Sequence, residues 1–189
     1  RTYQNLLQNP YDEQLFDYFV TSQLAYVDMQ GNISNLGTPA IYRSASFSPD
    51  GQYLLVQKMV RPYSYLVPAQ SFPYQVSIWN AQGQEVKHLF DYKLNEAANL
   101  SRDAVSTDPR MYGWRPDQPA TLTWVLALDE GDPKKEVPFR DAVYQLAAPF
   151  NGQPQELAKT EWRYGGISYT DTDFAILSDL LNKRIKISV

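Results

Sequence analysis

The chain has 189 residues, of which 43% are hydrophobic and 14% aromatic, with a net charge of -4 and no Cys. This length suits a folded domain, and the acidic balance argues against a nucleic-acid partner. The absence of Cys excludes disulfides, thiolate metal sites and Cys nucleophiles. No apolar run approaches the roughly 18 residues of a membrane span, so we also expect no membrane partner.

Residues 1–22 form an N-terminal segment in which we expect one short helix. Asn9 is a candidate N-cap and Pro10 suits the first helical turn. The apolar residues that follow have a partly helical spacing, at Leu15, Phe16, Tyr18 and Phe19. From residue 23 to 189 the apolar period changes to two, which predicts β-strands.

Two kinds of hairpin alternate along residues 23–189. The first kind turns at a Gly flanked by Asn or Gln, and is expected over 24–36 (Gly31), 76–89 (Gly83) and 142–158 (Gly152). The second kind turns at an Asp that follows an aromatic residue, and is expected around Phe47/Asp50, Trp114/Asp117 and Tyr169/Asp171. This regular alternation indicates an internal repeat.

The repeat predicts an all-β fold, a partial β-propeller of about three four-stranded antiparallel blades. Complete blades are expected over 41–90 and 112–159, with half blades at 23–38 and 164–189. The insertions at 60–75, 91–111 and 129–140 would form rim loops. A β-sandwich is the alternative, although it does not require the hairpin types to alternate. Both ends of the sequence read as cut, and an open arc would expose edge strands prone to association.

Four aromatic residues are expected to pack between blades rather than to stack on a ligand: Phe47, Trp79, Trp114 and Trp124. The chain contains no Gly-x-Ser-x-Gly, and its one His, His88, lies in a hairpin strand with apolar neighbours. We therefore predict no catalytic residues. Asp129, Glu130 and Asp132 are interpreted as a solvated charge cluster rather than a calcium site. No metal and no cofactor is expected.

Several strings resemble one family. They are Ser48-Pro-Asp-Gly51, Arg61-Pro-Tyr-Ser-Tyr-Leu-Val-Pro68, Gly113-Trp-Arg-Pro-Asp117 and Leu128-Asp-Glu-Gly-Asp-Pro133. Together they are similar to the propeller of the prolyl oligopeptidase family of serine peptidases, in its glutamyl endopeptidase-like branch, often labelled dipeptidyl aminopeptidase. The similarity runs from about Thr2 to Thr172.

The resemblance implies a parent serine peptidase with a C-terminal α/β-hydrolase domain that carries the triad. This chain would be its non-catalytic propeller, which gates or positions peptide substrate. Its partners would be that hydrolase domain and the peptide. The family suggests a periplasmic or secreted location. A stand-alone propeller that binds a protein or peptide is the alternative function, and a lectin or sugar-hydrolase propeller ranks last.

If the parent cleaves after Glu, a guanidinium would suit the substrate carboxylate. Arg61 leads the candidates, together with Tyr63 and Tyr65 of the same aromatic insertion. The competing interpretation is that these aromatic residues pack over a blade and that Arg61 pairs with a neighbouring acid. Arg115, at a Pro-Asp turn, is a further candidate, and Arg102 and Arg110 are weaker ones.

Overall fold

The computed structural model describes residues 5–96, 104–170, 175–181 and 184–188, with side chains up to residue 180. The chain divides into two compact units: residues 1–47 with 51–98, and residues 99–189 with 48–50. Each unit is considered by itself below. Arg102 and Asp171 lie outside the described residues.

The predicted N-terminal helix is present as α1 (Pro10–Val20). Asn9 is its N-cap, because the Asn9 side chain accepts a hydrogen bond from the Asp12 N–H at 3.0 Å. Pro10 begins the helix, and Asp12 and Glu13 place negative charge in its first turn, where the helix dipole favours it. No residue of α1 is fully buried, so the helix lies on the surface of its unit.

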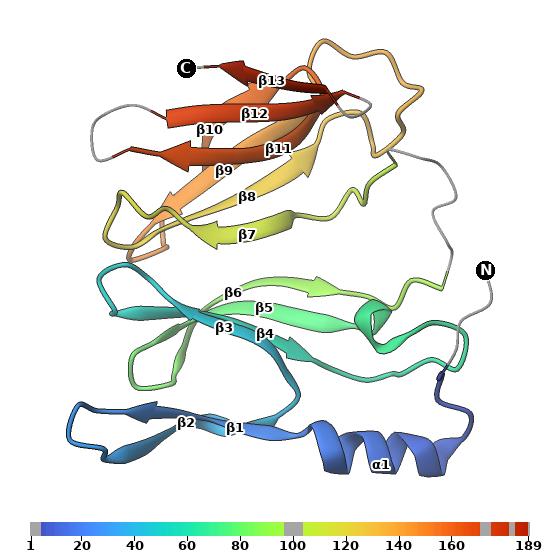
Figure 1. Cartoon of the computed structure of the whole chain (residues 1–189), viewed down its shortest axis with the longest axis vertical. Coiled ribbons are helices and arrows are strands. Elements are labelled where there is room, and N and C mark those ends of the chain that lie inside the picture. Colours follow the sequence, from blue (N-terminus) through green and yellow to red (C-terminus); the bar gives the residue numbers. More distant parts are fainter. Residues whose placement is uncertain (1–4, 97–103, 171–174, 182–183, 189) are drawn as a thin grey trace. The chain divides into compact units, whose positions relative to one another are not determined.

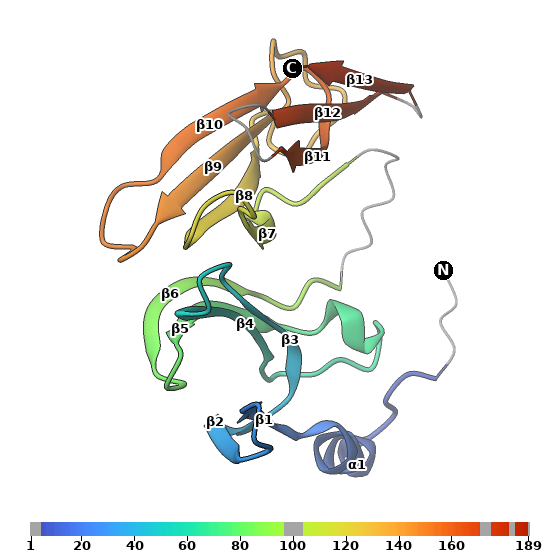
Figure 2. The same cartoon turned by 60° about the vertical axis from the view of Figure 1, so that its left-hand side comes forward.

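The first unit continues with a two-stranded hairpin and a four-stranded sheet (Figure 1). The hairpin joins β1 (Ser22–Val27) to β2 (Ile33–Ala40). The sheet has the order β3-β4-β5-β6, and all its neighbours are antiparallel. Its strands are β3 (Tyr42–Phe47), β4 (Tyr53–Met59), β5 (Tyr74–Asn80) and β6 (Glu85–Tyr92), with a 3-10 turn η1 (Ala69–Ser71) before β5. In Figure 2 this sheet is seen with its twist.

The central strands β4 and β5 supply the core of the first unit. Val56, Val76 and Ile78 are at most 1% exposed. A buried cluster of Leu36, Leu54, Val56 and Trp79 joins the β1–β2 hairpin to this sheet. The contact is close at Gly37, where an added Cβ would lie 2.5 Å from Cζ3 of Trp79.

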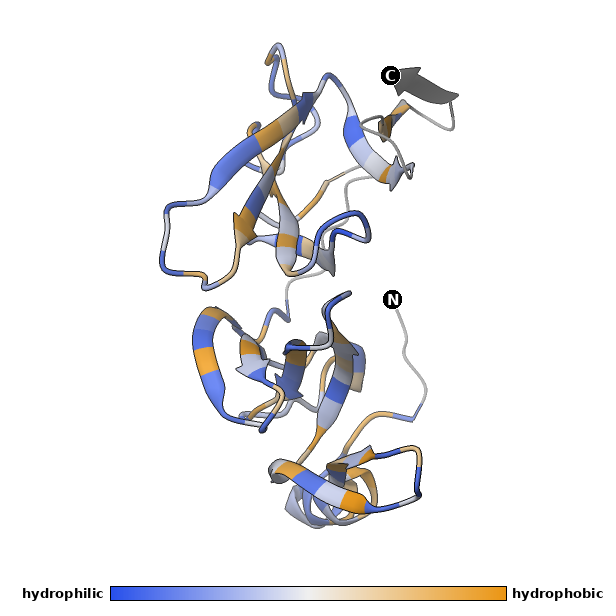
Figure 3. Ribbon diagram, turned by 90° about the vertical axis from the view of Figure 1, so that its left-hand side faces the viewer, coloured by the Kyte–Doolittle hydropathy of each residue, from blue (hydrophilic) through white to orange (hydrophobic). Residues whose placement is uncertain are grey.

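The second unit has a four-stranded sheet followed by a three-stranded one. The first sheet, in the order β7-β8-β9-β10, consists of β7 (Arg110–Trp114), β8 (Thr121–Ala127), β9 (Asp141–Ala147) and β10 (Gln155–Thr160). The other consists of β11 (Arg163–Tyr169), β12 (Ala175–Leu181) and β13 (Arg184–Ser188). Leu122, Val125 and Val143 form the buried centre of the four-stranded sheet, and Phe150 of the turn after β9 is buried as well. Figure 3 shows hydrophobic and hydrophilic bands that alternate along several strands, as the period of two predicts.

The prediction of an all-β fold with a short N-terminal helix is confirmed, and both four-stranded antiparallel sheets have the strand order of propeller blades. The C-terminal sheet has three strands, where a half blade over 164–189 was expected. The expectation that Phe47 is buried was wrong, because the residue is 45% exposed. Phe47 ends the edge strand β3, so only one neighbouring strand of its sheet can cover it. Trp79 and Trp124 are buried as expected, and Trp114 is half-buried.

Candidate functional site

The order of the strands places the loops of the second unit at opposite ends of its four-stranded sheet. In an antiparallel meander, the first and third connections share one end and the second connection lies at the other. The turns at 115–120 and 148–154 therefore lie together, and the loop 128–140 lies at the far end. Each end carries a distinct group of polar side chains.

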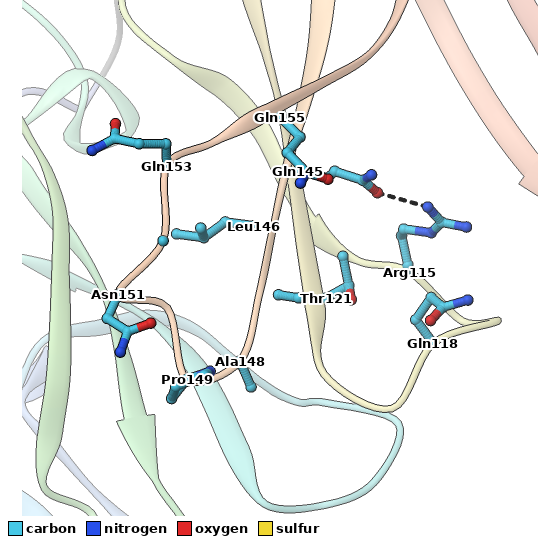
Figure 4. A pocket seen from close by; sticks show the side chains of 12 residues that line it. Arg115, Gln118, Thr121, Gln145, Leu146, Ala148, Pro149, Asn151, Gln153 and Gln155 are labelled. Atoms are coloured by element: carbon cyan, nitrogen blue, oxygen red, sulfur yellow. Dashed lines mark hydrogen bonds between the residues drawn. The ribbon is translucent and has the colours of Figure 1, made fainter.

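A pocket of about 450 Å³ lies at the end formed by the two turns (Figure 4). Its lining comes entirely from the second unit: Arg115, Gln118, Thr121, Gln145, Leu146, Ala147, Ala148, Pro149, Asn151, Gly152, Gln153 and Gln155. Arg115 is the one charged side chain in this lining, and five of the others are amides. The sequence-predicted candidate Arg115 thus lies on a pocket, although sequence reasoning did not find the amides beside it.

Arg115 is held firmly by its neighbours. Its Nε and Nη2 donate to the two carboxylate oxygens of Asp117 at 3.0 and 2.5 Å. Its Nη1 donates to Oε1 of Gln145 at 2.6 Å, and the guanidinium lies 4.7 Å from the ring centroid of Tyr169. The hydrogen bonds from Arg115 hold the pKa of the Asp117 carboxyl below its usual value. The guanidinium is therefore fixed in place, and the charge of Asp117 balances its own.

The candidates Arg61, Tyr63 and Tyr65 lie in the first unit, where they contact two acids of helix α1. Arg61 donates from Nη1 to Glu13 and from Nη2 to Asp17, the latter at 2.5 Å. The Tyr65 hydroxyl donates to Glu13 at 2.8 Å, and the Tyr63 hydroxyl donates to Asp17 at 2.5 Å. Each carboxylate thus accepts from one guanidinium N–H and one phenol. We call these five residues the helix clamp.

Aromatic packing reinforces the helix clamp. Phe16 of α1 meets the rings of Tyr63 and Phe72 edge-on, with centroids 5.2 and 5.9 Å away. Tyr63 and Phe72 are stacked at 5.0 Å, and the Arg61 guanidinium lies 4.5 Å from the centroid of Tyr63. This geometry matches the interpretation in which Arg61 pairs with neighbouring acids. A contact between Arg61 and substrate stays a prediction.

Helix α1 should be held less tightly in acid, because the helix clamp depends on the ionised carboxylates of Glu13 and Asp17. The hydrogen bond from Arg61, and then that from Tyr65, lowers the pKa of Glu13 below its usual 4.5. Burial opposes the shift at Asp17, but the hydrogen bonds from Tyr63 and Arg61 still lower its pKa below 3.8. A carboxyl with a lowered pKa in the folded state stabilises that state above its unfolded pKa and loses the contribution as pH falls through the folded value.

We therefore expect amide hydrogen exchange in α1 to accelerate as the pH falls below about 4.5, after correction for the intrinsic rate. Arg61→Gln should give fast exchange already at neutral pH and remove most of this pH dependence. His88→Gln is the control, because His88 lies in β6 between Glu85 and Asp91 and outside the helix clamp. Equal pH dependence in the Arg61 variant and the wild type would show that the helix clamp does not hold α1.

A third polar group, which we call the ion cluster, lies at the far end of the sheet β7–β10. Asp129 and Asp141 are both 0% exposed. Asp129 accepts from Arg140 at 2.8 Å, from both Nη atoms of Arg163 at 2.9 and 2.6 Å, and from the Gly131 N–H at 3.0 Å. Asp141 accepts from Arg163 at 3.1 Å, from the Tyr164 N–H at 2.7 Å, and from Arg110.

The ion cluster overturns the interpretation of Asp129 as part of a solvated charge cluster. Glu130 and Asp132 are exposed, but Asp129 faces inward and is enclosed. Burial alone would raise the pKa of Asp129, yet the hydrogen bonds from Arg163 and Arg140 hold it below its usual value. Because Arg163 belongs to β11, the cluster joins the three-stranded sheet to its four-stranded neighbour. Arg110, a weaker substrate candidate, is one of its members.

Within the described residues, no group of three or more His, Asp or Glu side chains is placed to hold a metal ion. His88 is half-exposed, with Nε2 3.2 Å from Asp91 and Nδ1 3.9 Å from Glu85. No helix in the part of the chain that the structure describes is long and apolar enough to cross a membrane.

These features define a protein built from blade-like antiparallel sheets, with a polar pocket on one of them. The chain is 43% identical over 188 residues to the probable glutamyl endopeptidase, chloroplastic, of Oryza sativa subsp. japonica. It is 42% identical over 179 residues to the protein of the same name from Arabidopsis thaliana. The matches cover 98% and 94% of this chain, but 20% and 18% of the relatives.

The chain is therefore homologous to one region of plant probable glutamyl endopeptidases, and it spans about a fifth of their length. This confirms the resemblance to the glutamyl endopeptidase-like branch that the sequence motifs indicated. No family model matches the chain, and neither does any solved structure.

Proposed function

We propose that this chain is the non-catalytic propeller region of a serine peptidase of the prolyl oligopeptidase family, and that it positions peptide substrate for a C-terminal α/β-hydrolase domain. The observation that carries the proposal is the 43% identity over almost the whole chain to part of a probable glutamyl endopeptidase. The sequence has no Gly-x-Ser-x-Gly elbow, so the nucleophile would belong to the rest of the parent protein.

The pocket at Arg115 supports the positioning role. It lies on turns at the end of a rigid sheet, where binding residues are commonly placed. Of the candidates Arg61, Tyr63, Tyr65 and Arg115, it is Arg115 that lines the pocket. We propose that the pocket contacts the substrate and that Arg61, Tyr63 and Tyr65 chiefly anchor α1, because a substrate carboxylate would have to displace Glu13 and Asp17.

The test compares this 189-residue chain with the full-length protein of the same gene, using a fluorogenic peptide that contains Glu and a matched peptide with Gln. We expect hydrolysis by the full-length protein alone, faster for the Glu peptide and abolished by a serine-directed phosphonate. A full-length protein that hydrolyses neither peptide would refute the proposal and leave a stand-alone binding propeller as the function to pursue.

A further inference from the structure

The pocket at Arg115 carries little net charge. Its lining contains no Asp, Glu or Lys, and Arg115 is its one charged side chain. Both carboxylate oxygens of Asp117 accept from that guanidinium, so the pair is neutral. A free carboxylate entering the pocket would meet a cation that already has its counter-ion. The electrostatics thus disfavour an acidic side chain as the ligand.

Amide groups dominate the polar part of the lining: Gln118, Gln145, Asn151, Gln153 and Gln155. Each carries both donors and an acceptor. Oε1 of Gln145 accepts from Arg115 at 2.6 Å, which orients that side chain and leaves its amide nitrogen Nε2 to donate. Asn151, Gln153 and Gln155 are exposed, and so are the apolar lining residues Ala147 and Pro149. The pocket therefore offers paired donors and acceptors beside apolar surface.

A peptide main chain has the complementary chemistry, because each of its units presents one N–H and one C=O without net charge. We infer that the pocket binds the main chain of an extended peptide and does not read an acidic side chain. This inference rests on the proposed function and names the part of the substrate that this region contacts. Discrimination for Glu would then arise outside the pocket.

The helix clamp gives independent support for the inference that this chain does not bind an acidic side chain of the substrate. There one guanidinium faces two carboxylates, Glu13 and Asp17, so a third carboxylate would be repelled. Arg61 and Arg115, the two leading arginine candidates for contact with a substrate carboxylate, are thus both already matched by acids of the chain.

The experiment measures binding without hydrolysis. A fluorescein-labelled, uncharged hexapeptide of Ala and Ser is titrated with the full-length protein in the presence of a serine-directed phosphonate, and polarisation gives Kd. The double variant Asn151→Ala/Gln153→Ala should raise Kd about five-fold for each hydrogen bond lost. Gln82→Ala, at an exposed Gln of the corresponding β5–β6 turn, is the matched control and should leave Kd unchanged.

Two further peptides identify what the pocket reads. A version with methylated main-chain nitrogens should bind the wild type more weakly, and its Kd should respond less to the double variant. For a version with one Ala replaced by Glu, the double variant should raise Kd by the same factor as for the neutral peptide. The inference is overturned if the double variant leaves every Kd unchanged, or if its effect is confined to the Glu peptide.

Asn151 and Gln153 lie in the exposed turn 148–154. If their replacement lowers the thermal unfolding midpoint of the protein, Gln118→Ala provides a second test, because Gln118 is exposed in the other turn, 115–120. Polarisation measures binding and does not require hydrolysis. A protein that hydrolyses no Glu peptide would therefore refute the proposed function, while the Kd values would still test the binding inference separately.

Discussion

Replacing Asp129 by Asn should lower the free energy of unfolding of the second unit by about 3–5 kcal/mol, the usual cost of breaking a buried ion pair on one side. Asp129 is 0% exposed and accepts from Arg140, from both Nη atoms of Arg163 and from the Gly131 N–H. The neutral amide keeps the size of the side chain but removes the charge. Arg140 and Arg163, only 17% and 11% exposed, would then be left under-compensated.

Urea denaturation followed by circular dichroism measures this effect, with hydrogen exchange in β9 and β11 as the local readout. Glu130→Gln is the matched control, because Glu130 is the next residue and its side chain is 78% exposed in its pair with Lys135. An exposed pair of this kind contributes at most about 1 kcal/mol. If the Asp129 variant were no less stable than the Glu130 variant, the ion cluster would not be what holds the two sheets together.

The Gly37→Ala variant should destabilise the first unit by about 2–5 kcal/mol, the sum of two penalties. Gly37 has φ +64°, a left-handed conformation that costs an L-residue about 1–2 kcal/mol. The new Cβ would also lie 2.5 Å from Cζ3 of Trp79, and such overpacking costs about 1–3 kcal/mol. We expect both the β1–β2 hairpin and the indole of Trp79 to shift.

Gly51→Ala separates the two penalties. Gly51 also has a left-handed φ, +70°, but an added Cβ there would meet nothing within 4 Å. Its replacement should therefore cost only the conformational part, about 1–2 kcal/mol. Urea midpoints and tryptophan fluorescence measure both variants. Equal destabilisation by the two would show that the contact between Gly37 and Trp79 contributes nothing to packing.

The strand pattern was predictable because it is local in the sequence. Turn glycines such as Gly31 and Gly83 follow apolar strands, and the structure gives both a positive φ. The alternation of hairpin types gave the order of strands within each four-stranded sheet. The N-cap at Asn9 was equally predictable from the sequence, since its partner Asp12 lies three residues away.

The contacts of the helix clamp and those of Arg163 in the ion cluster were not predictable, because they join residues far apart in the chain. Arg61 meets Glu13 across 48 positions, and Arg163 meets Asp129 across 34. Composition made Asp129 resemble its exposed neighbours, but its side chain turns inward to accept from Arg140 and Arg163. The amide side chains of the pocket are uncharged and belong to no recognisable sequence motif, so the sequence gives no sign of them. They come together only because two turns lie at the same end of the sheet.

The opposite placement of the pocket and the ion cluster has an evolutionary consequence. Changes in the length of the turns at 115–120 and 148–154 would remodel the pocket while sparing the buried charges at the other end of the sheet. Changes in the loop 128–140 would act the other way, because that loop contributes Asp129 and Arg140. Selection that acts on the pocket and selection for a folded sheet can therefore proceed on separate segments, so one end can diversify while the other stays fixed.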